Sequence, residues 1–275
     1  MAAFKLHLNL YLRFSINLIV GNVFDSFRKK ILNNYRLLIQ YDGTNYAGWQ
    51  IQQNIITVQQ KIVDAVEVIL KEKVNLIGSG RTDTGVHALG QVANFRIESE
   101  LDLYRFRYSL NSILPNDISV LKMEKVDESF HARFDAKERS YIYLFCDHKS
   151  PFYNNYSYYL PSISKFDFKY FNKISKVLLG NHDFTSFSRK NTEIEDKTCD
   201  VAEIWWRKGK RISTFYISAN RFMHGMVRTI VGTLLFAAEK NLGEDYLLKV
   251  LEQKNREEAD ESVPAKGLFL FKVRY

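Results

Sequence analysis

The sequence predicts an α+β fold of two lobes, with mixed, mostly antiparallel sheet flanked by helices. The chain has 275 residues, which exceeds a minimal domain, and 46% of them are hydrophobic, enough to fill a sizeable core. The order strand, helix, strand, strand, helix, strand occurs roughly twice, without a repeat in the sequence itself. We therefore divide the chain into an N-terminal extension (1–34), an N-terminal lobe (35–130) and a C-terminal lobe (131–275).

The first lobe opens with a strand at residues 35–41, which runs into the turn-forming sequence Asp-Gly-Thr-Asn. Thr57 is the expected N-cap of a helix, because apolar residues follow it on one helical face as far as Leu70. The other elements expected here are short strands at 75–77 and 91–97, a helix at 103–114 that Pro115 ends, and a strand at 118–126.

The second lobe begins with alternating apolar residues at 138–146, which predict a strand. Asp167 as N-cap and Gly180 just past the end bound a helix at 167–179. The other elements expected here are strands at 201–208 and 212–219, helices at 222–240 and 245–254, an acidic solvated loop at 255–262, and a strand at 267–275.

Charge and cysteine content limit the class of protein. The net charge is +8, which favours an acidic partner such as nucleic acid. Residues 1–34 contribute half of it, so the body of the chain is only mildly basic. Cys146 and Cys199 lie far apart and do not have metal-ligand spacing, which is typical of a reduced cytoplasmic protein. The apolar run at 14–24 is shorter than the roughly 20 residues that span a membrane, so we expect no membrane segment.

A glycine-rich loop at residues 78–88 is the strongest candidate for chemistry. Glycines let a backbone approach a ligand closely. The loop lacks the Lys-Ser/Thr ending of a phosphate-binding loop and the dinucleotide fingerprint, so no nucleotide cofactor is expected. An Asp between glycines is commonly only a turn former. The chemical interpretation is that Asp83, close to Arg81, stays ionised and acts as a nucleophile or electrostatic stabiliser without a metal or cofactor.

Eight segments together resemble the tRNA pseudouridine synthase A family, over residues 35–275. In chain order they are Tyr41-Asp42-Gly43 with Gly48-Trp49-Gln50, Gly80-Arg81-Thr82-Asp83 with Gly85-Val86-His87-Ala88, Asn111 with Leu114-Pro115, Phe130-His131-Ala132-Arg133-Phe134, Arg139-Ser140-Tyr141, Asp183-Phe184-Thr185-Ser186-Phe187, His224-Gly225-Met226-Val227-Arg228 and Lys266-Gly267-Leu268. One such segment would carry little weight, but eight in the same order are difficult to obtain otherwise.

The resemblance implies an active-site cleft between two lobes of the pseudouridine synthase type. It also implies isomerisation of uridine to pseudouridine at positions 38, 39 and 40 in the anticodon stem-loop of tRNA. No metal and no cofactor take part, and the enzyme is a cytoplasmic homodimer that is not bound to membranes. No atom is gained or lost in this reaction, which agrees with the missing cofactor motifs.

The resemblance also assigns roles to individual residues. Asp83 matches the catalytic aspartate, and whether it attacks the base or the sugar stays open. Tyr141 matches a tyrosine that stacks on the target base and helps to move the proton from C5. Arg228 matches an arginine that pairs with the carboxylate, and Leu268 matches an apolar residue packed near the base. We further hypothesise that Arg81 fills the space left by the extruded base, because a guanidinium is flat and able to stack. We assign no catalytic role to the histidines of these segments.

Some features depart from the family pattern. Thr84 stands where alanine is common, and Ser140 stands where a second basic residue is frequent. The family offers no counterpart for residues 1–34, which are either a basic RNA-binding extension or the product of a misplaced start; we favour the second interpretation. Three other functions remain as alternatives: the same chemistry at another RNA position, RNA binding without catalysis, and, less favoured, a nucleotide-binding enzyme.

Overall fold

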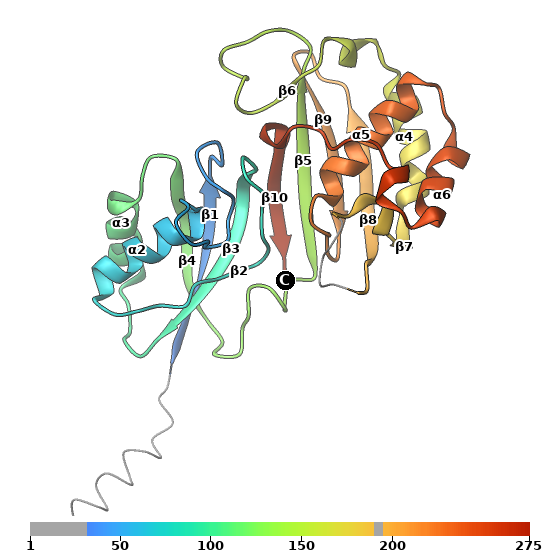
Figure 1. Ribbon diagram of the computed structural model, residues 1–275. Coiled ribbons are helices and arrows are strands. Elements are labelled where there is room, and N and C mark those ends of the chain that lie inside the picture. The colour runs from blue at the N-terminus through green and yellow to red at the C-terminus, as the bar shows by residue number, and fades with distance from the viewer. Residues whose placement is uncertain (1–31, 190–194) are drawn as a thin grey trace, which may run out of the picture.

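The computed structural model describes residues 32–189 and 195–275, so most of the expected N-terminal extension lies outside the described residues. The described part forms one mixed sheet in the order β4-β1-β3-β10-β5-β9-β8-β7, with β2 beside β3 and β6 beside β5 (Figure 1). The strands are β1 (Asn33–Tyr41), β2 (Ile77–Gly78), β3 (His87–Ile97), β4 (Ile118–Val126), β5 (Glu138–Cys146), β6 (Tyr158–Tyr159), β7 (Gly180–Asp183), β8 (Thr198–Arg207), β9 (Ile212–Ala219) and β10 (Leu268–Arg274). Among the strands of the described residues, only β10 with β3 and β6 with β5 pair in parallel, as expected for a mostly antiparallel sheet.

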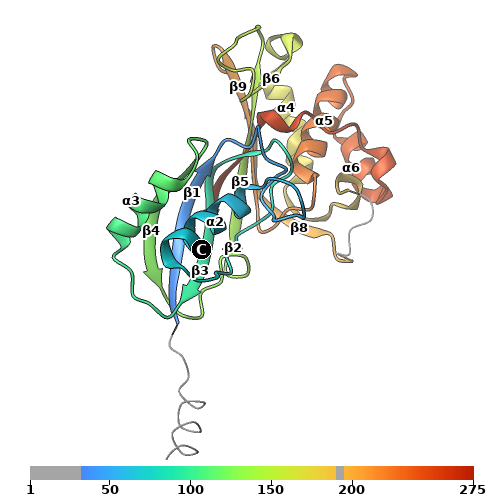
Figure 2. The ribbon, with the colours of Figure 1, turned by 60° about the vertical axis from the view of Figure 1, so that its left-hand side comes forward.

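The helices lie in two groups, one over each end of the sheet (Figures 1 and 2). The first group is α2 (Val58–Leu70) and α3 (Leu103–Ile113); the second is α4 (Phe168–Ser175), α5 (Met226–Glu239) and α6 (Glu244–Gln253). Thr57 caps α2 by accepting a hydrogen bond from the Gln60 backbone amide, and Asp167 caps α4 in the same way through Lys169, as the sequence predicts. None of the helices in these ranges is long and apolar enough to cross a membrane.

Both helix groups cover the same face of the sheet. Phe95 of β3 packs on Phe106 of α3, and Trp206 of β8 stacks on Phe171 of α4 with ring centroids 4.2 Å apart. The strand register places Phe95 and Trp206 on one face, since side chains of directly paired residues point the same way.

A row of paired residues crosses the sheet between the two helix groups. Tyr41 of β1 pairs with Ala88 of β3, Ala88 with Leu270 of β10, Leu270 with Tyr141 of β5, and Tyr141 with Ile217 of β9. All five side chains are buried. Loops, not helices, cover the middle of this row, and the glycine-rich loop is one of them.

Several expected boundaries were wrong. Strand β3 begins at His87, four residues before the expected start, because its first pairs are made with β10. Helix α5 begins at Met226, not at 222, because Gly225 takes the left-handed conformation (φ +76°). The expected helix at 167–179 ends as a helical turn of the 3₁₀ type at Lys176–Leu178. The acidic stretch contains another such turn at Arg256–Glu258 and a buried Ala259, so it packs against the core in part.

The short strands β6 and β7 were missed, because two to four residues are too few to show a period. The two halves of the sheet share one ladder through β10, and the lobe boundary at residues 130/131 stays a prediction.

The aromatic core of the second half gives a testable consequence. Trp206 is buried, stacks on Phe171 and donates a hydrogen bond from Nε1 to Ser175 Oγ at 3.0 Å. Trp206→Ala should lower the free energy of unfolding by about 3–5 kcal/mol, measured by urea denaturation. Trp205 points to the opposite face and stacks only on Tyr216, so Trp205→Ala should cost about 1 kcal/mol. Equal losses in the two variants would contradict this assignment of the faces.

Candidate active site

Backbone contacts with the β1–α2 connection shape the glycine-rich loop. The Trp49 amide donates to the Thr82 carbonyl at 3.1 Å, and the Gly85 amide donates to the Tyr46 carbonyl at 3.3 Å. Gly48 makes this approach possible: its φ is +90°, and a Cβ there would lie 2.3 Å from the Thr82 oxygen. The loop is therefore held by a neighbouring segment that only glycine allows to come so close.

Thr82 anchors the loop to the sheet and leaves Asp83 facing the solvent. The Thr82 side chain is buried, and its hydroxyl hydrogen-bonds the Tyr41 hydroxyl at 2.8 Å. Asp83, the next residue, keeps 24% of its side chain exposed. The carboxylate is thus accessible to a ligand while its backbone is fixed.

Each oxygen of the Asp83 carboxylate has a basic partner from the second half of the chain. His224 Nε2 lies 3.1 Å from Oδ1, and Arg228 Nη1 lies 3.5 Å from Oδ2. Arg228 belongs to the first turn of α5, and its Nε donates to the Val263 carbonyl at 2.7 Å. The Val263 carbonyl thus fixes the guanidinium, whereas His224 is nearly half exposed and precedes Gly225, whose φ is +76°.

Tyr141 lies on β5 in the central row of the sheet, with 9% of its surface exposed. Its ring meets Phe222 edge-on, with centroids 5.1 Å apart and an interplanar angle of 86°. Burial, together with the negative charge of Asp83, raises the pKa of the Tyr141 hydroxyl well above its usual value. The phenol therefore stays protonated at neutral pH.

The two other predicted residues lie in different surroundings. Leu268 is buried at the start of β10 and pairs with Tyr143, on the same face as Tyr141. Arg81 is exposed, and its guanidinium has no hydrogen bond or ion pair within residues 32–189 and 195–275. The structure thus brings Asp83, Arg228, Tyr141 and Leu268 to one region. The exposed Arg81 forms no hydrogen bond or ion pair with these four residues.

Arg139 has a structural position that the sequence did not indicate. Its guanidinium donates hydrogen bonds to backbone carbonyls only, those of Ser79, Arg133, Ala136 and Asn220, at 2.6–3.3 Å. Burial lowers its pKa, although five donated bonds replace the lost water. This side chain joins the start of the glycine-rich loop to the end of β9, from which Phe222 and His224 follow. Arg139 is part of a segment that resembles the family. The sequence does not indicate its contacts, because partners such as Ser79 and Asn220 lie 60 and 81 positions away.

One group within the described ranges has the side chains to hold a metal ion: Cys146, Asp147 and His148 at the end of β5. His148 Nδ1 lies 3.0 Å from Asp147 Oδ1 and 3.5 Å from the Cys146 sulfur. The thiol also donates to the His148 carbonyl at 3.1 Å, so these groups already satisfy one another. They do not contact Asp83 in the structure.

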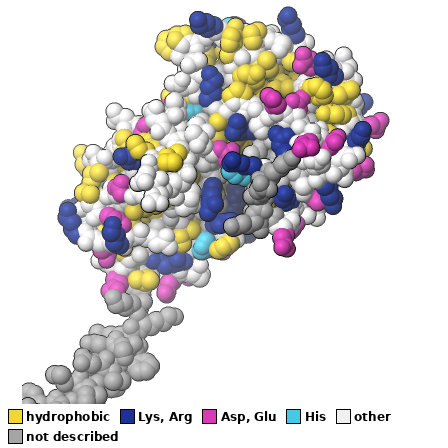
Figure 3. Space-filling model, in the orientation of Figure 1, with side chains coloured by type: hydrophobic (Ala, Val, Ile, Leu, Met, Phe, Trp, Pro, Cys, Tyr) yellow, Lys and Arg dark blue, Asp and Glu magenta, His cyan; other side chains and the backbone are white. Residues whose placement is uncertain are grey.

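The surface over the middle of the sheet is hollowed. In the space-filling view, Lys and Arg side chains gather along the hollow between the two halves, with His side chains at its edge (Figure 3). Such a basic lining suits a polyanionic ligand.

Comparisons with known proteins agree with one another. The chain matches the family described as tRNA pseudouridine synthase over residues 37–135 and 174–275. It is 37% identical over 246 residues to tRNA pseudouridine synthase A of a Thermoanaerobacter species, covering 89% of this chain and 100% of that protein. It is 42% identical over 243 residues to the protein of the same name from Chlorobium phaeovibrioides, covering 88% and 99%. It is 41% identical over 245 residues to that of Parabacteroides distasonis, covering 89% and 96%.

The loop contacts predict a large effect at one glycine. Gly48→Ala forces a left-handed conformation on alanine and a clash with the Thr82 carbonyl, and should cost at least about 1–2 kcal/mol of unfolding free energy. Gly80→Ala is the matched control, since a Cβ at Gly80 meets nothing within 4 Å. Denaturant unfolding of both variants measures the difference. A Gly48→Ala protein as stable as Gly80→Ala would show that the approach of the two segments is not tight.

Proposed function

The chain belongs to the tRNA pseudouridine synthase family, and we propose that it isomerises uridines in the anticodon stem-loop of tRNA with Asp83 as the nucleophile. Uridine isomerisation in tRNA follows from the family; the site in tRNA and the role of Asp83 are our proposal. The observation that supports it best is the Asp83 carboxylate, which is partly exposed, has His224 and Arg228 at its two oxygens, and lies near Tyr141.

In the proposed reaction Asp83 supplies the nucleophile. The bond between ribose C1′ and N1 of uracil breaks, the base turns, and C1′ bonds to C5. C5 then loses its proton and N1 gains one, so the atoms balance without a redox partner. Asp83 forms the covalent intermediate by attack on either the base or the sugar, and the carboxylate leaves again when the new bond has formed.

The neighbours of Asp83 have separate tasks in this proposal. Arg228, fixed by the Val263 carbonyl, orients the carboxylate and stabilises its charge. Tyr141 presents a neutral phenol, which can pass a proton on by giving up one while accepting another. Leu268 supplies apolar contact at the base, next to the row that contains Tyr141.

A uridine inside a paired stem must leave the helix before Asp83 can reach it. Arg81 is exposed at the loop that carries Asp83 and has a flat, charged guanidinium, so it suits the space that the base vacates. The basic hollow in Figure 3 would hold the phosphates, which makes tRNA binding weaker at high salt.

The open face of the sheet supports a homodimer, as expected from the family resemblance. Trp205, Tyr216 and Phe271 form a ladder of rings there, and Phe271 is 43% exposed. Apolar rings on an uncovered sheet suit contact with a second copy of the chain. Sedimentation equilibrium of the purified protein tests the dimer, and a monomer at micromolar concentration would reject it.

The central test is conversion of unmodified tRNA transcript, with pseudouridine mapped by position. Wild-type protein should place pseudouridine on the 3′ side of the anticodon arm. Asp83→Asn keeps the shape of the side chain without the nucleophile, and its single-turnover rate should fall by at least about 10³-fold. Asp64→Asn on the exposed side of α2 is the control and should retain the wild-type rate. Binding of tRNA without conversion by the wild type would reject the enzyme assignment, and an active Asp83→Asn variant would reject Asp83 as nucleophile.

Arg228 gives a second, graded prediction. A lysine at this position keeps the charge, but it cannot donate to Val263 and to Asp83 in the geometry of a guanidinium. Arg228→Lys should therefore lower the single-turnover rate by about 10–100-fold, as expected for loss of one positioned donor. The affinity for tRNA, measured by filter binding, should change little. A variant that loses affinity but not rate would show that Arg228 binds RNA and does not orient the carboxylate.

A further inference from the structure

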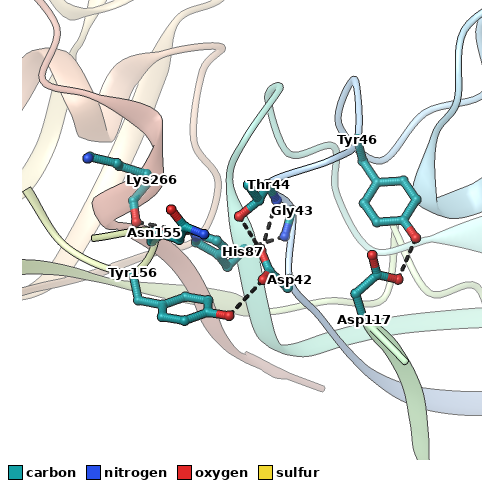
Figure 4. Close-up of polar contacts among 9 residues, drawn as sticks. All are labelled: Asp42, Gly43, Thr44, Tyr46, His87, Asp117, Asn155, Tyr156 and Lys266. Atoms are coloured by element: carbon teal, nitrogen blue, oxygen red, sulfur yellow. Dashed lines mark hydrogen bonds and ion pairs between the residues drawn. The ribbon is translucent and has the colours of Figure 1, made fainter. Parts of the chain in front are cut away.

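His87 is a buried, hydrogen-bonded side chain near the proposed active site, and the proposed reaction does not use it. It is the first residue of β3, four positions after Asp83, and only 1% of it is exposed. Its ring stacks on Phe269 of β10 with centroids 4.6 Å apart. The close-up shows the imidazole between two groups of residues, with Asn155, Tyr156 and Lys266 on one side and Asp42 to Thr44 on the other (Figure 4).

The partners of Nε2 determine where the ring carries its proton. Nε2 lies 2.9 Å from the Asn155 carbonyl oxygen and 3.2 Å from the Lys266 carbonyl oxygen. Carbonyl oxygens only accept hydrogen bonds, so Nε2 must be the protonated nitrogen. His87 therefore ties two segments of the second half to β3.

Nδ1 has two neighbours that require opposite protonation states. The Gly43 amide donates to Nδ1 at 3.0 Å, which needs a lone pair there. The Asp42 carboxylate oxygen Oδ1 lies 3.1 Å from the same nitrogen and can only accept from it. Burial outweighs the attraction of Asp42 and lowers the pKa of His87 below its usual value of about 6.5. At neutral pH the ring is neutral, and Gly43 is the bonded partner.

The hydrogen bond from Gly43 to His87 holds the turn after β1 against the end of the glycine-rich loop (residues 78–88), which carries Asp83 and is called the catalytic loop below. A Cβ at Gly43 would lie 2.1 Å from the Val86 carbonyl oxygen, so the two backbones touch there. Val86 in turn donates from its amide to the Asp83 carbonyl at 3.1 Å. On the other side of the ring, Lys266 lies two residues before Leu268. One imidazole thus connects the backbone of Asp83 with the segment that carries Leu268.

The Asp42 carboxylate beside Nδ1 is held in place by hydrogen bonds of its own. Its Oδ1 accepts from the Thr44 amide at 2.9 Å, and its Oδ2 accepts from the Tyr156 hydroxyl at 2.8 Å. The remaining titratable groups facing this cluster are Tyr46 and Asp117, which hydrogen-bond each other at 2.6 Å. Asn155 and Lys266 contribute only carbonyl oxygens to His87, and the Lys266 ammonium points to Asn154.

We infer that His87 is a positioning residue for the proposed reaction, whose hydrogen bonds hold the glycine-rich loop, the turn before Leu268 and the loop of Asn155 in their relative positions. Protonation turns Nδ1 into a donor to Asp42 and leaves the Gly43 amide without its acceptor. The catalytic loop then loses its fixed position relative to the turn after β1, although His87 never touches the substrate. This inference rests on the proposed function.

The pH dependence of the single-turnover rate tests it. In wild type the rate should be constant above neutral pH and fall up to tenfold per pH unit below the pKa of His87, under 6.5. His87→Asn places an amide oxygen near Nδ1, so it keeps an acceptor for Gly43 but cannot be protonated in this range. Its rate should be about tenfold lower at neutral pH and should lack the acid decline, with unchanged affinity for tRNA. His87→Gln restores a donor near Nε2 and should likewise lose the acid decline.

Two further variants test whether the acid decline arises from His87 and its neighbours or from elsewhere in the protein. Asp42→Asn removes the charge that raises the pKa of His87, so the acid decline should move to lower pH. His182→Gln alters a histidine of β7 whose ring nitrogen Nε2 hydrogen-bonds the Leu179 carbonyl, and should keep the wild-type profile. An acid decline at the same pH in His87→Asn and in wild type would overturn the inference.

Stability gives a readout that does not depend on catalysis. The unfolded chain binds a proton at His87 near pH 6.5, and the folded chain binds it only at lower pH. The neutral ring therefore contributes stability above pH 6.5, which is lost as pH falls toward the folded pKa. The free energy of unfolding should fall over this interval in wild type and less in His87→Asn. If wild type makes no pseudouridine at any pH, the proposed function fails, whereas identical stability profiles in the two proteins overturn the role of His87.

Discussion

The short parallel ladder between β3 and β10 is the constraint on which the rest of the structure depends. Only two residue pairs form it, Phe269 with His87 and Leu270 with Ala88, yet it joins the strands of the first half to those of the second. A C-terminal strand that enters the middle of the sheet separates the two helix groups and leaves the central strands to be covered by loops. The proposed active site lies over these central strands, between the two helix groups.

Backbone contacts and buried side chains together hold the glycine-rich loop that carries Asp83. Gly48 and Gly43 bring the connection after β1 against the loop, and the buried guanidinium of Arg139 binds the carbonyl at its start. Few conformations satisfy all of these contacts together. The Asp83 side chain can remain partly exposed, because its position does not depend on its own burial. This is the arrangement expected of a preorganised nucleophile in a site that must admit a large substrate.

Both halves of the chain contribute to the site, and their contributions differ in kind. The first half supplies the Asp83 carboxylate, the proposed nucleophile, on a loop whose backbone is held by hydrogen bonds. The second half supplies basic groups and rings: Arg228 from a helix, Tyr141 from a strand, and His224 from the segment between β9 and α5. His87 joins the two sets through hydrogen bonds to Gly43 on one side and Lys266 on the other. The distance between carboxylate and partners is thus fixed by contacts outside the reaction itself.

The sequence by itself determined the local features of this protein. Alternation of apolar residues placed β4 and β5 with their observed bounds, and Thr57 and Asp167 marked the starts of α2 and α4, because period and capping depend on neighbours within a few residues. The segments around Asp83 and Arg228 identified the family, which the comparisons show. Only the tertiary structure decided that β10 pairs with β3 and that His224 faces Asp83. It also decided that the buried His87 contacts Gly43, Asn155 and Lys266, which are separated from it by 44, 68 and 179 positions in the sequence. Such contacts join distant segments through single side chains, and they leave no period or spacing in the sequence.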